Sequence, residues 1–412
     1  MYEWREVELG DILHLITDYH SNGSYEILKE NVDLRDEKDY AIMIRTTNFE
    51  QNNFTENLKY INKSAYEFLR KSKVMAGDII MNKIANAGSI YSMPMLNQPV
   101  SLAMNLFLIR IDEKKANQKF IYYNLKANEK YIKTFAEGSV TKTITKNAVK
   151  NLTIRCPSIE TQAKIVEVLE SLEQKIENLR SQNQTLEKIA QTLFDRWFID
   201  FEFPNDSGEP YKSSGGAMIA SELGDIPVGW RVGKLGDEFE IIMGQSPAGS
   251  SFTEDERGMI FFQGRTDFGF RFPKTRMYTT EPKRIAEESD VLVSVRAPVG
   301  DVNIAHKRCC IGRGLAAVRS KRKSYCFYKL KSFKKFFDVF ESEGTVFGSI
   351  NKQGFNNLES CIPSHEDIDC FDKVARGIDN KILNNSNQIQ TLTKTRDTLL
   401  PKLMSGQIRI PE

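Results

Sequence analysis

Apolar residues recur at alternating spacings of four and three along two stretches of the chain, which is the heptad pattern of a coiled-coil helix. The first stretch covers residues 160–198, and the second repeats its register 206 residues later, with polar residues at most other positions. The seam positions are Ile165, Leu169, Leu172, Ile176, Leu179, Asn183, Leu186, Ala190, Leu193 and Trp197, then Phe371, Ala375, Ile378, Ile382, Asn385, Ile389, Leu392, Arg396, Leu399 and Leu403.

Each predicted helix would be roughly 55–60 Å long at 1.5 Å per residue, which is longer than a domain of this size needs. Two stripes in one register favour pairing of the helices with each other, as a spacer, over packing of each helix against its own domain. A different pattern precedes each stripe for about 150 residues. Short β-like runs such as "DIIMNK", "LFLIRI", "MIFFQG" and "DVLVSVR" alternate with Gly and Asn turns and one aromatic-rich helix. The pattern predicts an α+β fold of two mixed α/β domains and two long helices.

The two halves of the chain repeat each other, which decides the architecture. A shift of 226 carries Trp4, Leu9, Gly10 and Asp11 onto Trp230, Leu235, Gly236 and Asp237, and a shift of 206 carries Gly138 onto Gly344. The shrinking shift places insertions in the first half of the first copy. We predict globular domains at 1–157 and 227–363, spacer helices at 158–200 and 364–404, a linker at 201–226 and a tail at 405–412.

Composition excludes several classes of protein. The six cysteines form no Cys-x-x-Cys pair and the four histidines are scattered, so neither a disulfide framework nor a zinc site is expected. The sequence has no charged-then-apolar leader and no apolar stretch near 18 residues, which predicts a cytoplasmic protein that does not span a membrane. Phosphate-loop, base-methyltransferase and nucleophile-elbow motifs are also missing. A duplicated unit without catalytic motifs is best interpreted as a binder with two heads.

Charge is nearly balanced, at +2, but eleven Lys or Arg and no Asp or Glu lie between Lys307 and Phe337. Such a run is either a solvated face or a nucleic-acid footprint. Arg, Lys, Asn, Gln and Thr, which contact phosphates and base edges, also recur in equivalent turns of both copies. The candidate DNA-contacting residues are Arg45, Thr46, Thr47, Asn48, Lys83, Lys142, Thr143 and Lys146 in the first copy, and Gln263, Arg265, Thr266, Arg296, Arg313, Asn351 and Lys352 in the second.

Longer motifs are specific enough to indicate a family. "TLTKTRDTLLPKLMSGQI", "IAQTLFDRWFIDFEFP" and "SELGDIPVGWRVGKLGD" resemble signatures of type I restriction-modification specificity subunits, and the junction "GSVTKTITKNAVKNLTIRCPSIETQAKI" is similar to theirs. The resemblance covers both copies. The second copy departs at its own junction, where "CIPSHEDIDCF" lacks the glutamine seen at Gln162.

The resemblance implies a function for each part. Two target-recognition domains would each read one half of a split, asymmetric DNA site, and the helices would form an antiparallel coiled coil that sets their spacing. Two methyltransferase subunits would dock on this chain and restriction-translocase subunits would join them. This chain would carry neither catalysis nor cofactors, because S-adenosylmethionine, ATP and Mg belong to the partners. The alternatives are a coiled-coil scaffold that bridges proteins without reading DNA, and a methyltransferase with a fused reader.

An antiparallel pair fixes which seam residues meet. If Asn183 faces Asn385, the numbers of facing residues add up to 568 and the other central layers are apolar against apolar. A slip of one heptad would leave each buried amide against an aliphatic residue, at about 1–3 kcal/mol apiece. The two asparagines are therefore predicted to fix the register. By the same symmetry, Glu412 should end near Met1.

Overall fold

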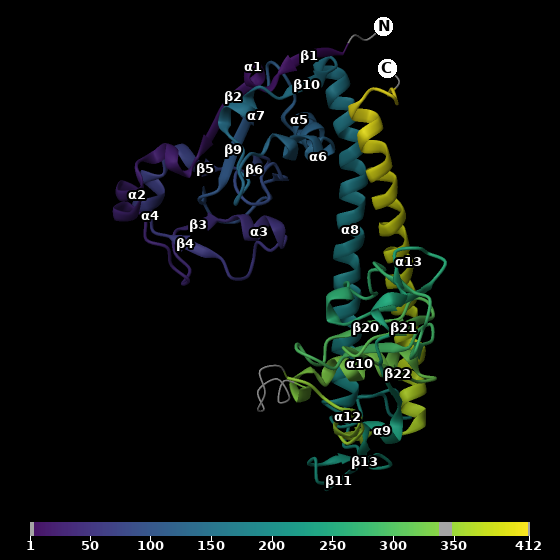
Figure 1. The fold of residues 1–412 in the computed structure, drawn as a ribbon. Coiled ribbons are helices and arrows are strands. Elements are labelled where there is room, and N and C mark those ends of the chain that lie inside the picture. Colours follow the sequence, from purple (N-terminus) through teal and green to yellow (C-terminus); the bar gives the residue numbers. More distant parts are fainter. Residues whose placement is uncertain (1–3, 338–347, 411–412) are drawn as a thin grey trace. The chain divides into compact units, whose positions relative to one another are not determined.

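The heptad stripes are two 40-residue helices in the computed structural model, α8 (Ile159–Phe198) and α13 (His365–Met404). The structure describes residues 4–337 and 348–410. Contacts divide the chain into unit 1, Met1–Glu177 with Ile389–Glu412, and unit 2, Asn178–Gln388. Each long helix contributes one stretch to each unit, and within each unit a stretch of α8 lies beside a stretch of α13 (Figure 1).

Unit 1 contains two four-stranded sheets and a separate strand pair. The antiparallel sheet has the order β2-β9-β6-β7, and the mixed sheet has the order β4-β3-β8-β5 with β3 and β8 parallel. The strands are β1 (Arg5–Glu8), β2 (Leu13–Asp18), β3 (Ala41–Ile44), β4 (Lys59–Ile61), β5 (Lys73–Val74), β6 (Ile79–Asn82), β7 (Ile90–Ser92), β8 (Val100–Leu102), β9 (Leu106–Ile111) and β10 (Thr153–Cys156). The helices are α1 (Leu9–Ile12), α2 (Tyr25–Asn31), α3 (Thr46–Glu50), α4 (Lys63–Phe68), α5 (Gln118–Ala127), α6 (Glu129–Ile132) and α7 (Lys146–Lys150), with short 3-10 turns between them.

Unit 2 repeats this topology, but its mixed sheet has five strands instead of four. Its antiparallel sheet has the order β14-β22-β19-β20, and in its mixed sheet β16 and β21 are parallel, as β3 and β8 are in unit 1. The strands are β11 (Met218–Ile219), β12 (Ile226–Pro227), β13 (Arg231–Lys234), β14 (Glu240–Met243), β15 (Phe252–Thr253), β16 (Met259–Phe262), β17 (Tyr278–Thr279), β18 (Ile285–Ala286), β19 (Val291–Ser294), β20 (Val302–Ile304), β21 (Cys309–Ile311), β22 (Leu315–Arg319) and β23 (Glu359–Ile362). The helices are α9 (Leu235–Glu238), α10 (Lys323–Ser332) and α12 (Lys352–Asn356), and η5 (Arg265–Asp267) is a 3-10 turn.

Each domain packs its core directly against the long helices. In unit 2 the rings of Phe194 and Phe198 on α8 contact Phe371 on α13, and both also contact Tyr325 on α10. In unit 1 aliphatic residues of both helices join the core of the domain, among them Leu169 and Leu403. Stretches of both helices are therefore part of the core of each unit, so a domain cannot turn on its own stretches without breaking apolar contacts.

The buried seam of unit 2 contains the two asparagines, at 2 % and 0 % exposure. Asn183 Nδ2 donates to Ser386 Oγ at 3.2 Å, and Asn385 Nδ2 donates to Gln182 Oε1 at 3.4 Å. The residue numbers of these pairs add up to 569 and 567, so the helices are antiparallel here and each asparagine lies beside a neighbour of the other. The carboxamide oxygens of both asparagines are buried without a hydrogen-bond partner in the described chain.

The segment between α8 and β13 is ordered, although its Gly, Ser and Pro content is typical of a linker. Phe203 stacks between Tyr211 and Trp230, with ring centroids 4.5 and 5.0 Å apart. The C-terminal tail has a matching position in unit 1, where Ile408 and Ile410 pack against the core, as Trp4 does. Met1 and Glu412 themselves lie outside the described residues.

This placement predicts tolerance to circular permutation. A chain opened in the exposed turn at 205–208, with its original ends joined by a short Gly-Ser linker, should fold with a thermal midpoint within a few degrees of the parent. The reason is that Phe203 and Tyr211 stay packed on either side of the new opening. Thermal unfolding measured by circular dichroism tests this, and a control opened inside α8 should not fold. A permutant opened at 205–208 that also failed to fold would contradict the placement of the tail.

Candidate nucleic-acid interface

One groove of unit 2 collects five of the seven residues predicted for the second copy. It has a volume of about 570 Å³ and is formed by the turns that follow β16, β19 and β21 together with Ser246 and Pro247 after β14. These turns lie at one edge of the two sheets because β16 and β21 run parallel and β22 connects β14 with β19. The predicted residues that line the groove are Gln263, Arg265, Thr266, Arg296 and Arg313.

Close backbone packing holds the floor of this groove. A Cβ atom on Gly312 would lie 2.9 Å from Gln263 Oε1, and one on Gly314 would lie 2.8 Å from the carbonyl oxygen of Gln263. Ser246 Oγ donates to Gln263 Oε1 at 3.3 Å and accepts from the Arg313 amide at 3.2 Å. The two glycines let the turn that carries Arg313 approach Gln263 closely, so both side chains are presented to the same volume.

The three arginines of the groove differ in their partners. Arg265 Nε pairs with Asp301 at 2.7 Å, and Lys334 contacts the same carboxylate. Burial raises the pKa of Asp301, but hydrogen bonds from Arg265 and Lys334 outweigh this and lower it. Arg296 and Arg313 are exposed, and neither has an ion-pair partner in the described part of the chain. The positive charge that is available to a ligand is therefore that of Arg296 and Arg313.

Asn351 and Lys352 lie close to the groove without lining it. The Ser349 backbone bridges to Arg296, and the Ile350 amide donates to the Val295 carbonyl oxygen at 3.1 Å, which brings this segment alongside the β19–β20 turn. Asn351 Oδ1 accepts from the Gly354 amide and so caps α12. The side chain of Lys352 is exposed.

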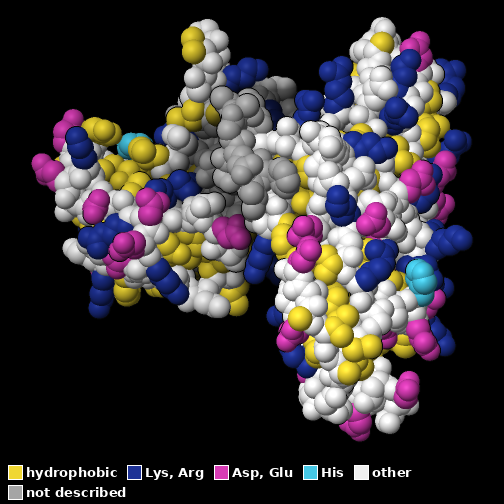
Figure 2. All heavy atoms as spheres, turned by 90° about the horizontal axis from the view of Figure 1, so that it is seen from below, with side chains coloured by type: hydrophobic (Ala, Val, Ile, Leu, Met, Phe, Trp, Pro, Cys, Tyr) yellow, Lys and Arg dark blue, Asp and Glu magenta, His cyan; other side chains and the backbone are white. Residues whose placement is uncertain are grey.

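The basic run Lys307–Phe337 does not form a single positive patch. Six of its cations pair with carboxylates of the described chain: Arg308 with Glu287, Arg319 with Asp290, Arg322 with Asp369, Lys329 with Glu238, Lys331 with Glu187 and Lys334 with Asp301. In Figure 2 the basic and acidic side chains are interspersed over the visible face. Of the eleven cations of this run, Arg313 lines the groove.

In unit 1 two of the predicted segments of the first copy lie side by side. Ile84 bridges to Thr143, and the Ala85 amide donates to the Lys142 carbonyl oxygen at 3.1 Å, so the 83–86 turn lies beside 142–143. Arg45 follows β3, as Gln263 follows β16, but its Nη2 donates to the Asn57 carbonyl oxygen at 2.8 Å. Thr46 and Thr47 begin α3, where Thr47 is exposed and Thr46 is half-buried.

Asn48 has a role different from the predicted one. Its side chain is 4 % exposed, its Oδ1 accepts from the Arg45 amide at 2.9 Å, and its Nδ2 donates to the Asn53 carbonyl oxygen at 3.2 Å. Asp267 accepts from the Gln263 amide in the same way in unit 2. Asn48 therefore shapes the turn that carries Arg45, and its assignment as a DNA contact is corrected because both ends of the carboxamide are used inside the protein.

Lys83 and Lys146 meet at an acid that the sequence analysis did not single out. Asp18 is 6 % exposed and its carboxylate contacts Lys83 Nζ at 3.0 Å and Lys146 Nζ at 3.1 Å. Burial raises the pKa of Asp18, but hydrogen bonds from Ser21, Lys83 and Lys146 outweigh this and lower it to about 2. Both lysines are half-buried, and the Asp18 carboxylate balances part of their positive charge. The position of Asp18 in the sequence gives no signal of this pairing, because its partners are 65 and 128 residues away.

Asparagine at position 18 should therefore destabilise unit 1 in a pH-dependent manner. The folded pKa lies below the value of about 3.9 for an unfolded Asp, so this stabilisation is complete above about pH 4 and is lost as the pH falls towards 2. We expect Asp18→Asn to lower the free energy of unfolding by about 1–3 kcal/mol at pH 6 and by much less at pH 2. Urea unfolding at both pH values tests this. The control is Asp36→Asn, which removes the carboxylate of an exposed ion pair. Equal losses at the two pH values would contradict it.

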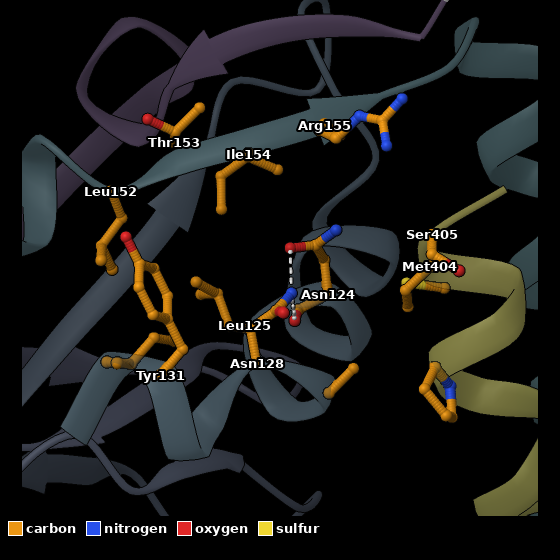
Figure 3. A pocket seen from close by; sticks show the side chains of 13 residues that line it. Asn124, Leu125, Asn128, Tyr131, Leu152, Thr153, Ile154, Arg155, Met404 and Ser405 are labelled. Carbon is orange, nitrogen blue, oxygen red and sulfur yellow. Dashed lines mark hydrogen bonds between the residues drawn. The ribbon is translucent and has the colours of Figure 1, made fainter. Parts of the chain in front are cut away.

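A second hollow, in unit 1, is chemically unlike the groove. It has a volume of about 240 Å³ and lies between α5–α6, β10 and the end of α13 (Figure 3). Asn128 Nδ2 donates to the carbonyl oxygen and Oδ1 of Asn124, and Leu125, Ile154 and Met404 supply apolar walls. Arg155 is its one cation, and it contains none of the predicted DNA-contacting residues.

Two features that could indicate other chemistry are missing from residues 4–337 and 348–410. No three His, Cys, Asp or Glu side chains are grouped there to hold a metal ion. No helix in these ranges is both long and apolar enough to cross a bilayer.

Comparisons with known proteins agree over nearly the whole chain. A sequence model of the family described as "Type I restriction modification DNA specificity domain" matches residues 1–188 and 227–393, one match in each copy. A Methanocaldococcus jannaschii protein provisionally named the type I restriction enzyme MjaX specificity subunit is 30% identical over 99% of this chain and 94% of its own. The HindI specificity subunit of Haemophilus influenzae is 26% identical over 99% of this chain and 100% of its own.

A solved structure also shares the fold. The crystal structure of a type I restriction-modification system S subunit from M. genitalium matches 98% of this chain and 96% of its own, with a TM-score of 0.55 and 15% identity.

Proposed function

Because the chain belongs to the type I restriction-modification DNA specificity family, we propose that unit 1 and unit 2 each read one half of a bipartite, asymmetric DNA site. The observation that carries this proposal is the groove of unit 2, where Gln263, Arg296 and Arg313 are presented to one volume. Arginine pairs with guanine edges and glutamine with adenine edges, and both also contact phosphates. The turns of unit 1 carry different side chains at the equivalent positions, so the two half-sites differ in sequence.

The helix pair is the spacer of this reader. Since α8 and α13 are antiparallel and belong to the cores of both domains, they fix how far apart two half-sites are read. One heptad of slip would move a helix by about 10 Å, or roughly three base pairs. The buried Asn183 and Asn385 would then lose their polar partners, so the seam resists this slip.

The chemistry belongs to partner subunits in this proposal. The chain would dock two methyltransferase subunits, which bind S-adenosylmethionine, and restriction-translocase subunits, which use ATP and Mg. The absence of methyltransferase and phosphate-loop motifs from the sequence supports this division. Mapping of methylated bases in the host genome, with and without this gene, tests the whole proposal, and the expected result is loss of methylation at one bipartite motif.

Purified alone, the chain should neither methylate nor cut DNA. Addition of a cognate methyltransferase subunit should restore methylation, because the chain supplies the recognition and the partner supplies the cofactor site. Transfer of labelled methyl groups from S-adenosylmethionine to duplex DNA measures both. Methyl transfer by the lone, homogeneous chain would contradict the proposal.

Salt dependence separates this function from a scaffold that only bridges proteins. Neutralised phosphates release counterions, so the affinity for a bipartite duplex should fall steeply with salt concentration. A chain that contacted proteins alone would show no binding to the duplex at any salt concentration.

A further inference from the structure

Arg271 is the largest fully buried side chain of the described structure, and it neither lines the groove nor belongs to the seam. It lies in the connection between η5 and β17, six residues after Arg265 of the groove. Its guanidinium donates to Glu187 Oε2 on α8 at 3.1 Å and to Asp379 Oδ1 on α13. It also donates to Tyr328 Oη on α10 at 3.2 and 3.1 Å.

These contacts depend on the directions of the guanidinium N–H groups as well as on the charge of the group. The group lies over the ring of Phe327, 3.7 Å from its centroid, while its edges meet two carboxylates on two different helices. Burial lowers the pKa of Arg271, but Asp379, Tyr328 and Glu187 outweigh this and raise it, so the group stays charged. Well-packed apolar residues often stabilise a fold as well as a buried ion pair does, so stability alone does not explain this arginine. A planar guanidinium that bonds to two helices also fixes the orientation of its own segment relative to those helices.

The connection that carries Arg271 is tied to the groove at one end and to the sheet at the other. The Lys274 amide donates to the Asp267 carbonyl oxygen at 2.8 Å, and Asp267 holds the Gln263 amide at 2.7 Å. The Ile304 amide on β20 donates to the Arg271 carbonyl oxygen at 2.9 Å. Hydrogen bonds therefore hold the connection that carries Arg271 against the reading turn 263–267 through Lys274, and the Arg271 side chain bonds this connection to α8 and α13.

The first copy uses a simpler link. Tyr123 Oη donates to Glu173 on α8 at 2.7 Å, which matches the bond of Tyr328 to Asp379 on α13 at 2.8 Å. The connection after β3 in unit 1 has bonds within itself, from Arg45 to Asn57 and from Asn48 to Asn53, and Glu50 accepts from Asn82 on β6 at 3.3 Å. An arginine fork that reaches from the reading turn to both helices is thus an addition of the second copy.

We propose that Arg271 is a positioning residue, which fixes the orientation of the second reading groove on the helix pair and thereby narrows the range of spacer lengths that the protein accepts. This inference rests on the proposed bipartite reading of DNA. It concerns the geometry between the half-sites, whereas the affinity of the groove for its own half-site comes from Gln263, Arg296 and Arg313.

The test variant is Arg271→Met with Asp379→Asn. Glu187 keeps Lys331 as its partner, and the carboxamide that replaces the Asp379 carboxylate still offers an acceptor to Tyr328, so this variant leaves no buried charge unpaired. The matched control is Arg322→Met with Asp369→Asn, which removes another arginine fork to α13 in unit 2, one that is exposed to solvent. Both are assayed as full chains in complex with the cognate methyltransferase subunits. The substrates are duplexes with the mapped half-sites at the native spacing or one base pair longer or shorter, and a duplex with the second half-site alone.

We expect the parent and the control variant to prefer the native spacing strongly. In the Arg271→Met/Asp379→Asn variant, the ratio of affinity for the native spacing to affinity for the altered spacings should fall at least tenfold. Its affinity for the second half-site alone should stay within twofold of that of the parent. Unchanged spacing preference would overturn the proposal. So would an equal loss on the half-site duplex, since Arg271 would then support the groove itself. A parent without any spacing preference would instead contradict the bipartite function.

Arg271→Lys keeps the test decisive if the double variant does not fold. Lysine retains the charge but cannot reach both carboxylates and Tyr328 with fixed directions. It should fold and show a partial, several-fold loss of spacing preference. A folded Arg271→Lys protein with the preference of the parent would overturn the positioning role.

Discussion

Replacement of Arg313 by alanine should weaken binding to the second half-site by about 1–3 kcal/mol, or roughly 5- to 150-fold, and leave the first half-site unaffected. Arg313 is exposed, lines the groove, and has no ion-pair partner within the described chain, so its guanidinium is available to a base edge or phosphate. Gly312 and Gly314 hold it against Gln263. Fluorescence titration with duplexes that carry each half-site separately measures the loss, and methylation mapping shows which base position is relaxed.

The control for this prediction is Arg257→Ala. Arg257 is 91% exposed, pairs with Asp255 in the same unit, and lies outside the groove. Its removal should change affinity only slightly at moderate salt. If Arg257→Ala and Arg313→Ala reduced binding equally, long-range charge and not the groove would account for the effect.

Arg265 should contribute less than Arg313, although the sequence gives both the same weight. Its guanidinium already pairs with Asp301, so a DNA contact must replace or share that bond. The sequence could not reveal this because Asp301 lies 36 residues further along the chain and its carboxylate meets Arg265 only after the β19–β20 turn has formed. The expected contribution of each arginine to DNA affinity therefore depends on its bonding partners in the fold, which the sequence does not show.

Other parts of the fold and site were accessible from the sequence for clear physical reasons. The heptad spacing identifies α8 and α13 because a seam between two helices demands apolar residues on one narrow stripe. The repeated "WR…LGD" start and the glycine-containing turns identify two equivalent domains, since the same local geometry is needed twice. The side chains of the groove follow from the types of residue that these turns expose.

Contacts between distant segments were not accessible. Asn, Asp and Arg are residue types usually found on the surface. Yet Asn48, Asp18 and Arg271 are each buried and bonded to groups elsewhere in the chain. Their roles depend on which acid or base the fold places opposite them. The insertion in the first copy, with α2 and α4, also obscures the alignment of the two reading turns. Without that alignment, the sequence cannot show that Asn48 has a different role from Arg45, Thr46 and Thr47.

Alanine at Phe371 should have the largest effect on stability, about 3–5 kcal/mol. Phe371 is fully buried on α13, and its ring lies 5.2–5.8 Å from those of Phe194, Trp197 and Phe198 on α8. Removal of the ring leaves a cavity that these large, mutually packed aromatics cannot close by small movements. Since total stability is typically about 5–15 kcal/mol, unit 2 would become marginal at physiological temperature.

The matched variant is Ile165→Ala, 206 positions earlier in the repeat and buried in unit 1 at 2 % exposure. It should cost less, about 2–4 kcal/mol, because its aliphatic neighbours can partly fill the smaller cavity. Urea unfolding monitored together with binding to each half-site separates the two variants. Phe371→Ala should reduce binding to the second half-site more than to the first, and Ile165→Ala should do the reverse. Equal losses at both half-sites in both variants would show that the shared helices couple the two cores into one unfolding unit, and the separate reading of each half by its own domain would then depend on the integrity of the whole chain.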